Sequence, residues 1–249
     1  NAALGQVDPQ MFVPGMYDVR VCAEDAWGNR TCSEARTYEL SAATPKSGMT
    51  RLAFLDGFVQ VSGIPISVWR IYDSRTKQAG DFGRGWTLEA DAVKLQANRP
   101  MGEDWQQQKF SGFFPTYQLV ATEDHKVTVT MPDGTSHRFR MRPNPQSQLL
   151  FPIQYLDSAI FDPLPGTTAR LDALGQPEWI DGGPEGPVTI LDGNFEVYNP
   201  SGYLLTLVDG RKLTFLGSGG ALQYKLDSIQ DTNGNTVWFE NNRIVHSAG

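Results

Sequence analysis

The sequence predicts an all-β protein built from antiparallel strands, and three observations support this prediction. Glycine and proline, 25 and 16 residues respectively, make up about a sixth of the 249 residues and recur in pairs typical of turns. Between them lie short segments in which apolar and polar residues alternate with the period of a half-buried strand. Hydrophobic residues account for 40% of the chain, which is enough for a packed core. We therefore expect many short strands in a twisted antiparallel sheet or β-meander.

The first forty residues predict a hairpin. Apolar and polar side chains alternate over residues 17–24, residues 25–29 form a turn-like sequence, and a second alternating strand covers residues 30–40. Folding the chain about this turn places Cys22 opposite Cys32. The two cysteines fit a disulfide, which would imply an oxidising compartment, or two free thiols that face different ways.

Three segments further along the chain predict strands. Residues 58–72 are apolar on both faces, which is typical of a central, covered strand, and Pro65 within them predicts a bulge or a bend. Residues 126–141 predict a hairpin with its turn at residues 132–135. Residues 88–96 have a helix-favouring composition but follow a strand-like entry, and we expect a strand there.

The second half of the chain predicts loops and then a meander. Residues 143–187 are rich in proline, glycine and glutamine and have no clean period, so we expect long loops with short strands between them. Turn sequences then follow in close succession, which predicts strands of about five or six residues. These sequences are Asp192-Gly193, Ser201-Gly202, Asp209-Gly210, Gly217-Ser218-Gly219-Gly220 and Asn233-Gly234. The apolar alternations over residues 203–207 and 236–239 are two of the strands expected between them.

The composition argues against several classes of function. The net charge is −7, with 28 acidic residues against 21 basic ones, so we expect no nucleic-acid partner. No apolar run has the length needed to cross a bilayer, and we expect no membrane insertion. The cysteines have no nearby histidine with which to build the usual zinc site, so we expect no metal and no cofactor. The three histidines, His125, His137 and His246, are far apart and no G-x-S-x-G motif occurs, which argues against a hydrolytic triad.

Two short motifs have simpler explanations than the chemistry they resemble. Residues 81–83 spell the metal-binding tripeptide of kinases, but the other kinase motifs are missing and the nearby glycines do not form a dinucleotide fingerprint. Residues 231–235 resemble the start of a calcium loop. The twelfth position of that loop would be Asn242, a poor bidentate ligand, so we interpret residues 231–235 as a turn.

Two groups of residues leave binding or catalytic functions open. Adjacent carboxylates at Glu103-Asp104 and Glu123-Asp124 are compatible with a glycosidase, because the spacing of its catalytic pair is spatial. An aromatic group surrounds Ser111-Gly112 and predicts either a hydrophobic plug or a surface that contacts a sugar or a protein. Its members are Trp105, Phe110, Phe113, Phe114 and Tyr117.

Four segments resemble proteins of the Rhs/YD-repeat family. Residues 63–75, GIPISVWRIYDSR, and residues 80–88, GDFGRGWTL, resemble the family's entry segment, in which a strand with the pattern R-x-Y-x-S leads into G-x-F-G-x-G-W. Residues 127–134 resemble its hairpins with a DG turn, and residues 226–235 resemble its repeat L-x-x-I-x-D-x-N-G-N. The resemblance covers about residues 50–249, although residues 143–187 carry no matching motif.

The beginning of the chain resembles a different module. Residues 14–29 are similar to the closing strands of immunoglobulin-like modules, but forty residues are too few for a whole sandwich. We therefore expect a partial immunoglobulin-like hairpin over residues 1–42, a linker around residues 41–48, and an Rhs/YD-repeat-like β-sheet domain over residues 43–249.

The Rhs/YD-repeat resemblance implies a β-sheet that spirals into a hollow cage. Bacterial members enclose a C-terminal toxin, and animal teneurins use a related shell in adhesion; the family's autoproteolytic motif and toxin do not occur in this sequence. We therefore expect a non-catalytic structural segment of a secreted or cell-surface protein, bacterial in origin, with the remainder of the parent chain and a toxin cargo as partners. Two alternatives stay open: an adhesin module that binds a glycan or a surface receptor, and a glycoside hydrolase.

Overall fold

The computed structural model describes residues 12, 15–24, 29–40, 50–61, 63–74, 79–80, 82–89, 93–131, 135–217, 222–240 and 243–248. The regular structure in these residues is β-strand, and every strand pairing is antiparallel, which confirms the predicted all-β class. The chain forms two compact units. The first holds the strands before residue 60 and those between residues 66 and 89, and the second holds the strands from residue 94 onward together with residues 63–65. The domain boundary expected between residues 42 and 43 stays a prediction.

The first unit begins with two short antiparallel pairs. Strand β1 (Gly15–Val19) pairs with β4 (Arg36–Leu40), and β2 (Cys22–Glu24) pairs with β3 (Arg30–Cys32). The register places Cys22 opposite Cys32, and their sulfur atoms form a disulfide. The sequence left open a disulfide or two free thiols for this pair, and the structure contains the disulfide. Residues 25–28 of the turn predicted at residues 25–29, and the linker predicted at residues 41–48, lie outside the described residues.

The first unit also contains a three-stranded sheet in the order β5-β6-β9. Its strands are β5 (Arg51–Val59), β6 (Ile66–Asp73) and β9 (Trp86–Glu89), and a small hairpin of β7 (Ala79–Gly80) and β8 (Gly83–Arg84) accompanies them. The range predicted as one central, covered strand, residues 58–72, is divided, because Phe58 and Val59 belong to β5. Strand β6 is central in the sheet, as predicted, but it is not covered, since Trp69 is 39% exposed. Of the bulge or bend predicted at Pro65, the structure has a bend, at Gly63 and Ile64. The bulge lies in β5, between Leu55 and Gly57. Pro65 lies just before β6, where its missing N–H removes no ladder hydrogen bond.

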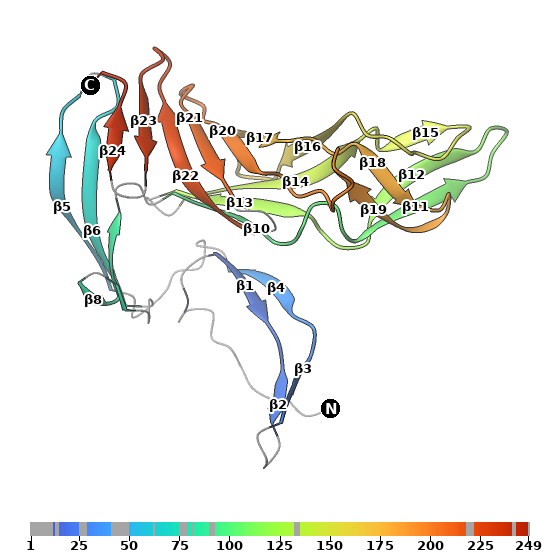
Figure 1. Ribbon diagram of the computed structural model, residues 1–249, viewed down its shortest axis with the longest axis horizontal. Coiled ribbons are helices and arrows are strands. Elements are labelled where there is room, and N and C mark those ends of the chain that lie inside the picture. The colour runs from blue at the N-terminus through green and yellow to red at the C-terminus, as the bar shows by residue number, and fades with distance from the viewer. Residues whose placement is uncertain are drawn as a thin grey trace. The chain divides into compact units, whose positions relative to one another are not determined.

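The second unit contains a ten-stranded sheet, most of which closes into a barrel (Figure 1). Its strands are β10 (Lys94–Ala97), β13 (Lys126–Thr130), β14 (Ser136–Asn144), β16 (Ser158–Pro163), β17 (Arg170–Leu174), β20 (Gly202–Thr206), β21 (Lys212–Leu216), β22 (Gln223–Gln230), β23 (Thr236–Phe239) and β24 (Ile244–His246). They follow one another in this order, as a meander does. Strand β10 also pairs with β22 through Leu95↔Tyr224 and Gln96↔Gln223, and this pairing closes the first eight strands.

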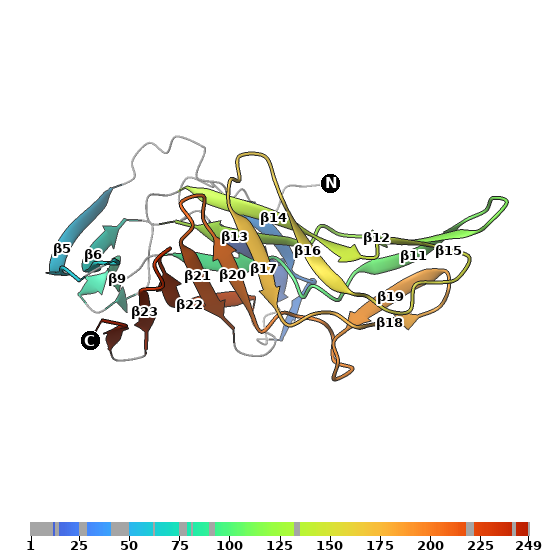
Figure 2. The ribbon, with the colours of Figure 1, turned by 90° about the horizontal axis from the view of Figure 1, so that it is seen from above.

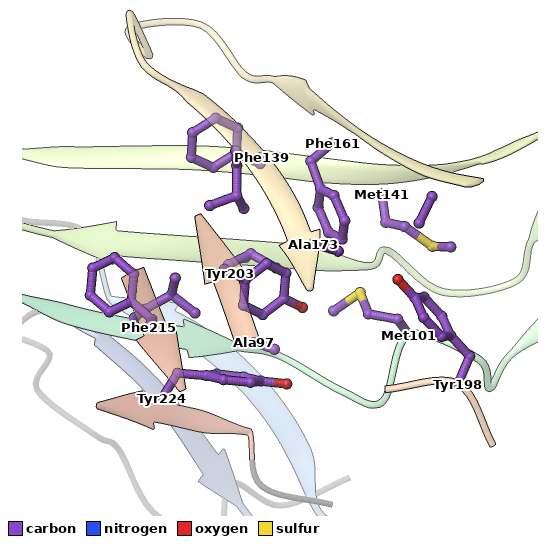
Figure 3. Packing of buried hydrophobic residues seen from close by; sticks show 14 of the residues in the cluster. Ala97, Met101, Phe139, Met141, Phe161, Ala173, Tyr198, Tyr203, Phe215 and Tyr224 are labelled. Carbon is purple, nitrogen blue, oxygen red and sulfur yellow. The ribbon is translucent and has the colours of Figure 1, made fainter. Parts of the chain in front are cut away.

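Side chains that alternate along the barrel strands fill its interior. Most of these strands contribute two buried residues spaced two apart, which is the inward half of the pleat. They include Leu95, Ala97, Val127, Val129, Phe139, Met141, Ala159, Phe161, Leu171, Ala173, Tyr203, Leu205, Leu213, Phe215 and Tyr224. Figure 3 shows side chains from different strands meeting there, with Tyr203 edge-on to both Phe161 and Tyr224. Burying one such large side chain contributes about 1.5–3 kcal/mol to folding.

A five-stranded sheet lies at one end of the second unit, beside the barrel (Figure 2). Its order is β15 (Ser147–Leu149), β12 (Thr116–Ala121), β11 (Trp105–Phe110), β19 (Gly186–Leu191) and β18 (Trp179–Gly182). Residues 143–187 thus form short strands between loops, as predicted, and they serve both sheets.

The described turns agree with most of the predicted ones. Asp209-Gly210 lies between β20 and β21, and Asn233-Gly234 lies between β22 and β23, each with a positive φ at the glycine. The prediction of a turn at Ser201-Gly202 is wrong, because Gly202 begins β20. A Cβ at Gly202 would overlap the Phe215 carbonyl oxygen, so glycine is needed there for the close approach of two strands. No helix that is long and apolar enough to span a membrane occurs among the described residues.

Candidate functional site

The aromatic group nominated from the sequence does not form one surface. Strands β11 and β12 form a hairpin whose base is buried and whose tip projects from the unit (Figure 2). Trp105 and Tyr117 are buried, whereas Phe110 and Phe114 are exposed and Phe113 is 95% exposed. The five residues are therefore divided between the core and the tip.

Trp105 belongs to a buried cluster at the base of the hairpin. Its Nε1–H donates to the Met101 carbonyl oxygen at 2.9 Å, and its ring stacks on His125 with centroids 4.5 Å apart. The His125 Nε2 lies 2.7 Å from the Glu103 carbonyl oxygen. Burial lowers the pKa of His125, so the imidazole is neutral at pH 7. Trp105 and His125 thus hold the hairpin on the core.

The hairpin tip and the neighbouring strand β15 form an exposed apolar surface, which we call the apolar tip. Leu149 pairs with Thr116, and the Leu150 N–H donates to the Pro115 carbonyl oxygen at 2.8 Å, so the two segments lie side by side. The exposed members are Phe110, Phe113, Phe114, Leu149, Leu150 and Phe151. Residues 110–122 and 143–156 carry no charged side chain. An exposed patch of this kind is typical of a contact site.

Three further aromatic residues, which the sequence did not bring together, form a second exposed group. Tyr155 and Trp179 have ring centroids 4.7 Å apart, and Trp179 and Phe195 have centroids 5.1 Å apart. Tyr155 is 58% exposed, Phe195 is 64% exposed, and Trp179 is half-buried between them. We call this group the aromatic row. It assembles because Tyr155 forms a β-bridge with Trp179, the first residue of β18, while Phe195 lies in the turn after β19.

The turn that carries Phe195 is held by one carboxylate. The Asp192 Oδ1 accepts hydrogen bonds from the N–H groups of Asn194 at 2.9 Å and Glu196 at 3.0 Å. The Asp192 N–H in turn donates to the Glu196 carbonyl oxygen at 2.9 Å. Within this turn Phe195 has a φ of 62°, in the left-handed region that disfavours a bulky side chain.

The aromatic row lies in an acidic part of the chain. Residues 171–210 contain no lysine, arginine or histidine and seven carboxylates. These are Asp172, Glu178, Asp181, Glu185, Asp192, Glu196 and Asp209. Glu178 directly precedes Trp179, and its carboxylate lies close to Gly193, in the turn that carries Phe195. Three of the seven are paired with basic residues: Asp172 with Arg170, Asp209 with Arg211, and Glu185 with Lys109. The other four, Glu178, Asp181, Asp192 and Glu196, lie within three residues of Trp179 or Phe195, and their charge disfavours an anionic ligand at the row.

Three of the four carboxylates that left a glycosidase open, Asp104, Glu123 and Asp124, form ion pairs with basic residues. Asp104 forms an ion pair with Arg99, which also lies 3.7 Å from Glu123. Asp124 lies 2.9 Å from Lys126 and 3.2 Å from Arg140, and the hydrogen bond from Lys126 is the main cause of its lowered pKa. A glycosidase acid needs a raised pKa, so this environment favours a structural role for these residues.

Residues 231–235 form a turn in which the Asp231 carboxylate accepts hydrogen bonds from the residues that follow it. The Asp231 Oδ1 accepts from the N–H groups of Asn233 and Asn235 at 2.8 and 2.9 Å, and its Oδ2 accepts from the Asn235 Nδ2 at 2.7 Å. The position that would close a calcium loop, Asn242, lies outside the described residues. Among the residues that the structure describes, no group of three or more His, Cys, Asp or Glu side chains could hold a metal ion.

No protein-family model, no curated protein and no solved structure matches this chain. The resemblance to Rhs/YD-repeat proteins therefore rests on the motifs in residues 63–88, 127–134 and 226–235 alone.

Proposed function

We propose that this chain is a non-catalytic structural segment of a large secreted or cell-surface protein of the Rhs/YD-repeat class, in which it helps to form or seal a β-sheet shell. The motifs at residues 63–75, 80–88 and 226–235 give the class. In this proposal the partners are the remainder of the parent chain and, inside the shell, a toxin cargo.

The observation that carries the proposal is the apolar surface of the β5-β6-β9 sheet. Register places Phe54 opposite Arg70 and Leu88 on one face, and Leu55 opposite Trp69 on the other. Large apolar side chains are exposed on both faces. They are Leu52, Phe54 and Leu88 on the first face, and Leu55, Phe58 and Trp69 on the second. Strands that are apolar on both faces are normally covered on both, so this sheet is suited to packing against further sheets.

Two other features agree with a structural role. The barrel interior is occupied by packed side chains, as in a small barrel that serves as a rigid core. The apolar tip adds a second apolar surface for packing against a neighbour, and this one lies in segments without a charged side chain.

Protease protection of the parent protein tests the proposal directly. We expect the region downstream of this segment to resist cleavage when residues 50–249 are present and to be cleaved when they are deleted. Protection that does not depend on the segment would exclude a role in closing the shell.

Cysteine labelling tests the same proposal at a single position. The only two cysteines of the sequence are bonded to each other, so an introduced cysteine is the only free thiol. Leu55→Cys reports on the apolar sheet, and Val208→Cys, at an 83% exposed position between β20 and β21, is the matched control. Both variants should react with a maleimide in this chain alone, and only Val208→Cys should react in the parent protein. Equal labelling of both in the parent would contradict the proposal.

A further inference from the structure

We propose that the aromatic row of Tyr155, Trp179 and Phe195 is a binding platform for neutral glycans built of hexose units. This inference does not depend on the shell proposal, because it uses a different surface and different residues.

The two outer rings of the row leave surface open for a hexose. The centroid distances of 4.7 and 5.1 Å show that Tyr155 and Phe195 both pack against Trp179, so the surfaces left for a ligand are those that Tyr155 and Phe195 turn away from it. The outer rings are more than half exposed, so their surfaces are open to a ligand. The electron-rich face of an aromatic ring attracts the weakly positive C–H groups on the apolar face of a hexose.

The backbone of Phe195 supplies an independent argument. Its φ of 62° lies where glycine or asparagine is favoured and where a phenylalanine costs stability. Because the ring is 64% exposed, burial alone does not explain why a bulky residue occupies this position. Residues kept in strained conformations cluster at ligand sites, and here the strain directs an aromatic ring towards solvent beside Trp179.

The polar groups around the row indicate the class of glycan. Glu178, Asn194, Glu196 and Gln154 are exposed neighbours of the three rings in sequence, and they supply carboxylate and amide oxygens that accept hydrogen bonds from hydroxyl groups. Glu178, Asp181, Asp192 and Glu196, which lie within three residues of Trp179 or Phe195, repel sialylated, sulfated and phosphorylated glycans. A neutral glycan therefore fits this site better than an acidic one.

An acidic aromatic site can also bind a quaternary ammonium group, but the ring positions argue against this ligand. A cage for such a cation requires rings that face one another across the ligand. Here neighbouring rings are in direct contact and are tilted by 54° and 30°, so no space for a cation lies between them.

A binding experiment with the whole chain tests the inference. The probes are neutral gluco- and galacto-configured oligosaccharides, their sialylated and sulfated counterparts, acetylcholine and an arginine-rich peptide, each titrated at low and at high salt. We expect saturable binding of at least one neutral oligosaccharide, with an affinity that changes little with salt. The affinity for the sialylated form of the same oligosaccharide should be at least about tenfold lower. Binding of acetylcholine or of the peptide without any neutral glycan would overturn the assignment, as would an absence of binding to every neutral probe.

Three variants connect binding to the row. Phe195→Asn places a residue that tolerates the left-handed conformation at this position, and Tyr155→Ala removes an exposed ring. Both variants should keep the unfolding midpoint near that of the wild type. Both should weaken glycan binding about tenfold or more. Phe113→Ala, which removes the 95% exposed ring at the apolar tip, is the matched control and should bind like the wild type. Wild-type affinity in both row variants, or a loss in the control equal to theirs, would refute the site and would leave the shell proposal intact.

Discussion

The hydroxyl group of Tyr203 allows a quantitative test of the barrel interior. The residue is fully buried in the second unit. Its hydroxyl group interacts with the Tyr224 hydroxyl, but this interaction falls short of normal hydrogen-bond geometry, and no other described residue bonds to it. Burying a hydroxyl without a partner costs about 1–3 kcal/mol. Tyr203→Phe removes that oxygen and leaves a void much smaller than a methylene group, which costs a few tenths of a kcal/mol. We therefore expect the free energy of unfolding to rise by about 1 kcal/mol.

Two neighbouring tyrosines provide controls with the opposite expected sign. The Tyr224 hydroxyl donates to the Pro200 carbonyl oxygen at 3.0 Å, and the Tyr198 hydroxyl donates to the Gly175 carbonyl oxygen at 3.2 Å (Figure 3 shows the three tyrosines). Replacing either tyrosine by phenylalanine removes a hydrogen bond worth about 1 kcal/mol. Urea unfolding followed by circular dichroism, with the m-value checked for constancy, gives the order of the three variants. A loss of 1 kcal/mol or more in Tyr203→Phe would refute the reasoning, because it would mean that the hydroxyl has a partner in the interior.

Two further predictions concern the same unit. Burial raises the pKa of Tyr203 and raises that of Tyr224 to about 12, so the folded state keeps protons that unfolded tyrosines lose near pH 10. The free energy of unfolding should therefore be constant below pH 10. It should fall as the pH rises towards 12, by up to about 1.4 kcal/mol per pH unit for each tyrosine. Urea midpoints measured from pH 8 to 12 check this fall, and a slope that Tyr224→Phe leaves unchanged would contradict it. Gly102→Ala should lower the free energy of unfolding by about 3 kcal/mol, because the new Cβ would overlap the Ile190 carbonyl oxygen. Gly234→Ala should lower it by only about 1–2 kcal/mol, because Gly234 has a φ of +88° but open space around the position of the Cβ. Equal losses in the two alanine variants would show that the close backbone approach at Gly102 is not what requires glycine.

The local features of the fold could be predicted because adjacent residues determine them. The hairpin over residues 126–141 appears as β13 and β14, and residues 236–239 form β23 with the predicted bounds. In both cases only a few residues separate the strand from its partner in the sequence, so the alternation of side chains and the short connection specify the pairing together. The disulfide register in the first hairpin belongs to the same class of local inference.

Closure of the barrel could not be predicted in this way. It depends on Leu95 of β10 meeting Tyr224 of β22, and no local pattern specifies a pairing between strands so far apart in the sequence. The aromatic row has the same origin, since Tyr155, Trp179 and Phe195 come from three separate segments.

The division of the nominated aromatic group, by contrast, had a signal in the sequence. Trp105 and Phe110 begin and end one strand and are five positions apart, an odd difference, so the pleat places them on opposite faces. In the structure Trp105 is buried and Phe110 is exposed, as this rule requires. Alternation applied within the strand would have separated core from surface before the fold was known.

The two exposed aromatic surfaces of the second unit differ in their surroundings, and this difference supports separate roles for them. The apolar tip lies in segments without a charged side chain, so a partner that covers it leaves no charge buried and unpaired. The aromatic row is flanked by carboxylates. Backbone hydrogen bonds hold the segments that carry it: the Leu156 N–H donates to the Glu178 carbonyl oxygen at 3.0 Å, and the Tyr198 N–H donates to the Ile190 carbonyl oxygen at 2.9 Å. Because Leu156, Tyr198 and Ile190 are buried, the row is held on a rigid base, and a ligand would bind it without first ordering the chain. A surface that has to be covered by another protein is better without charges, whereas a surface that binds a hydrated sugar needs both the rings and the acceptors around them.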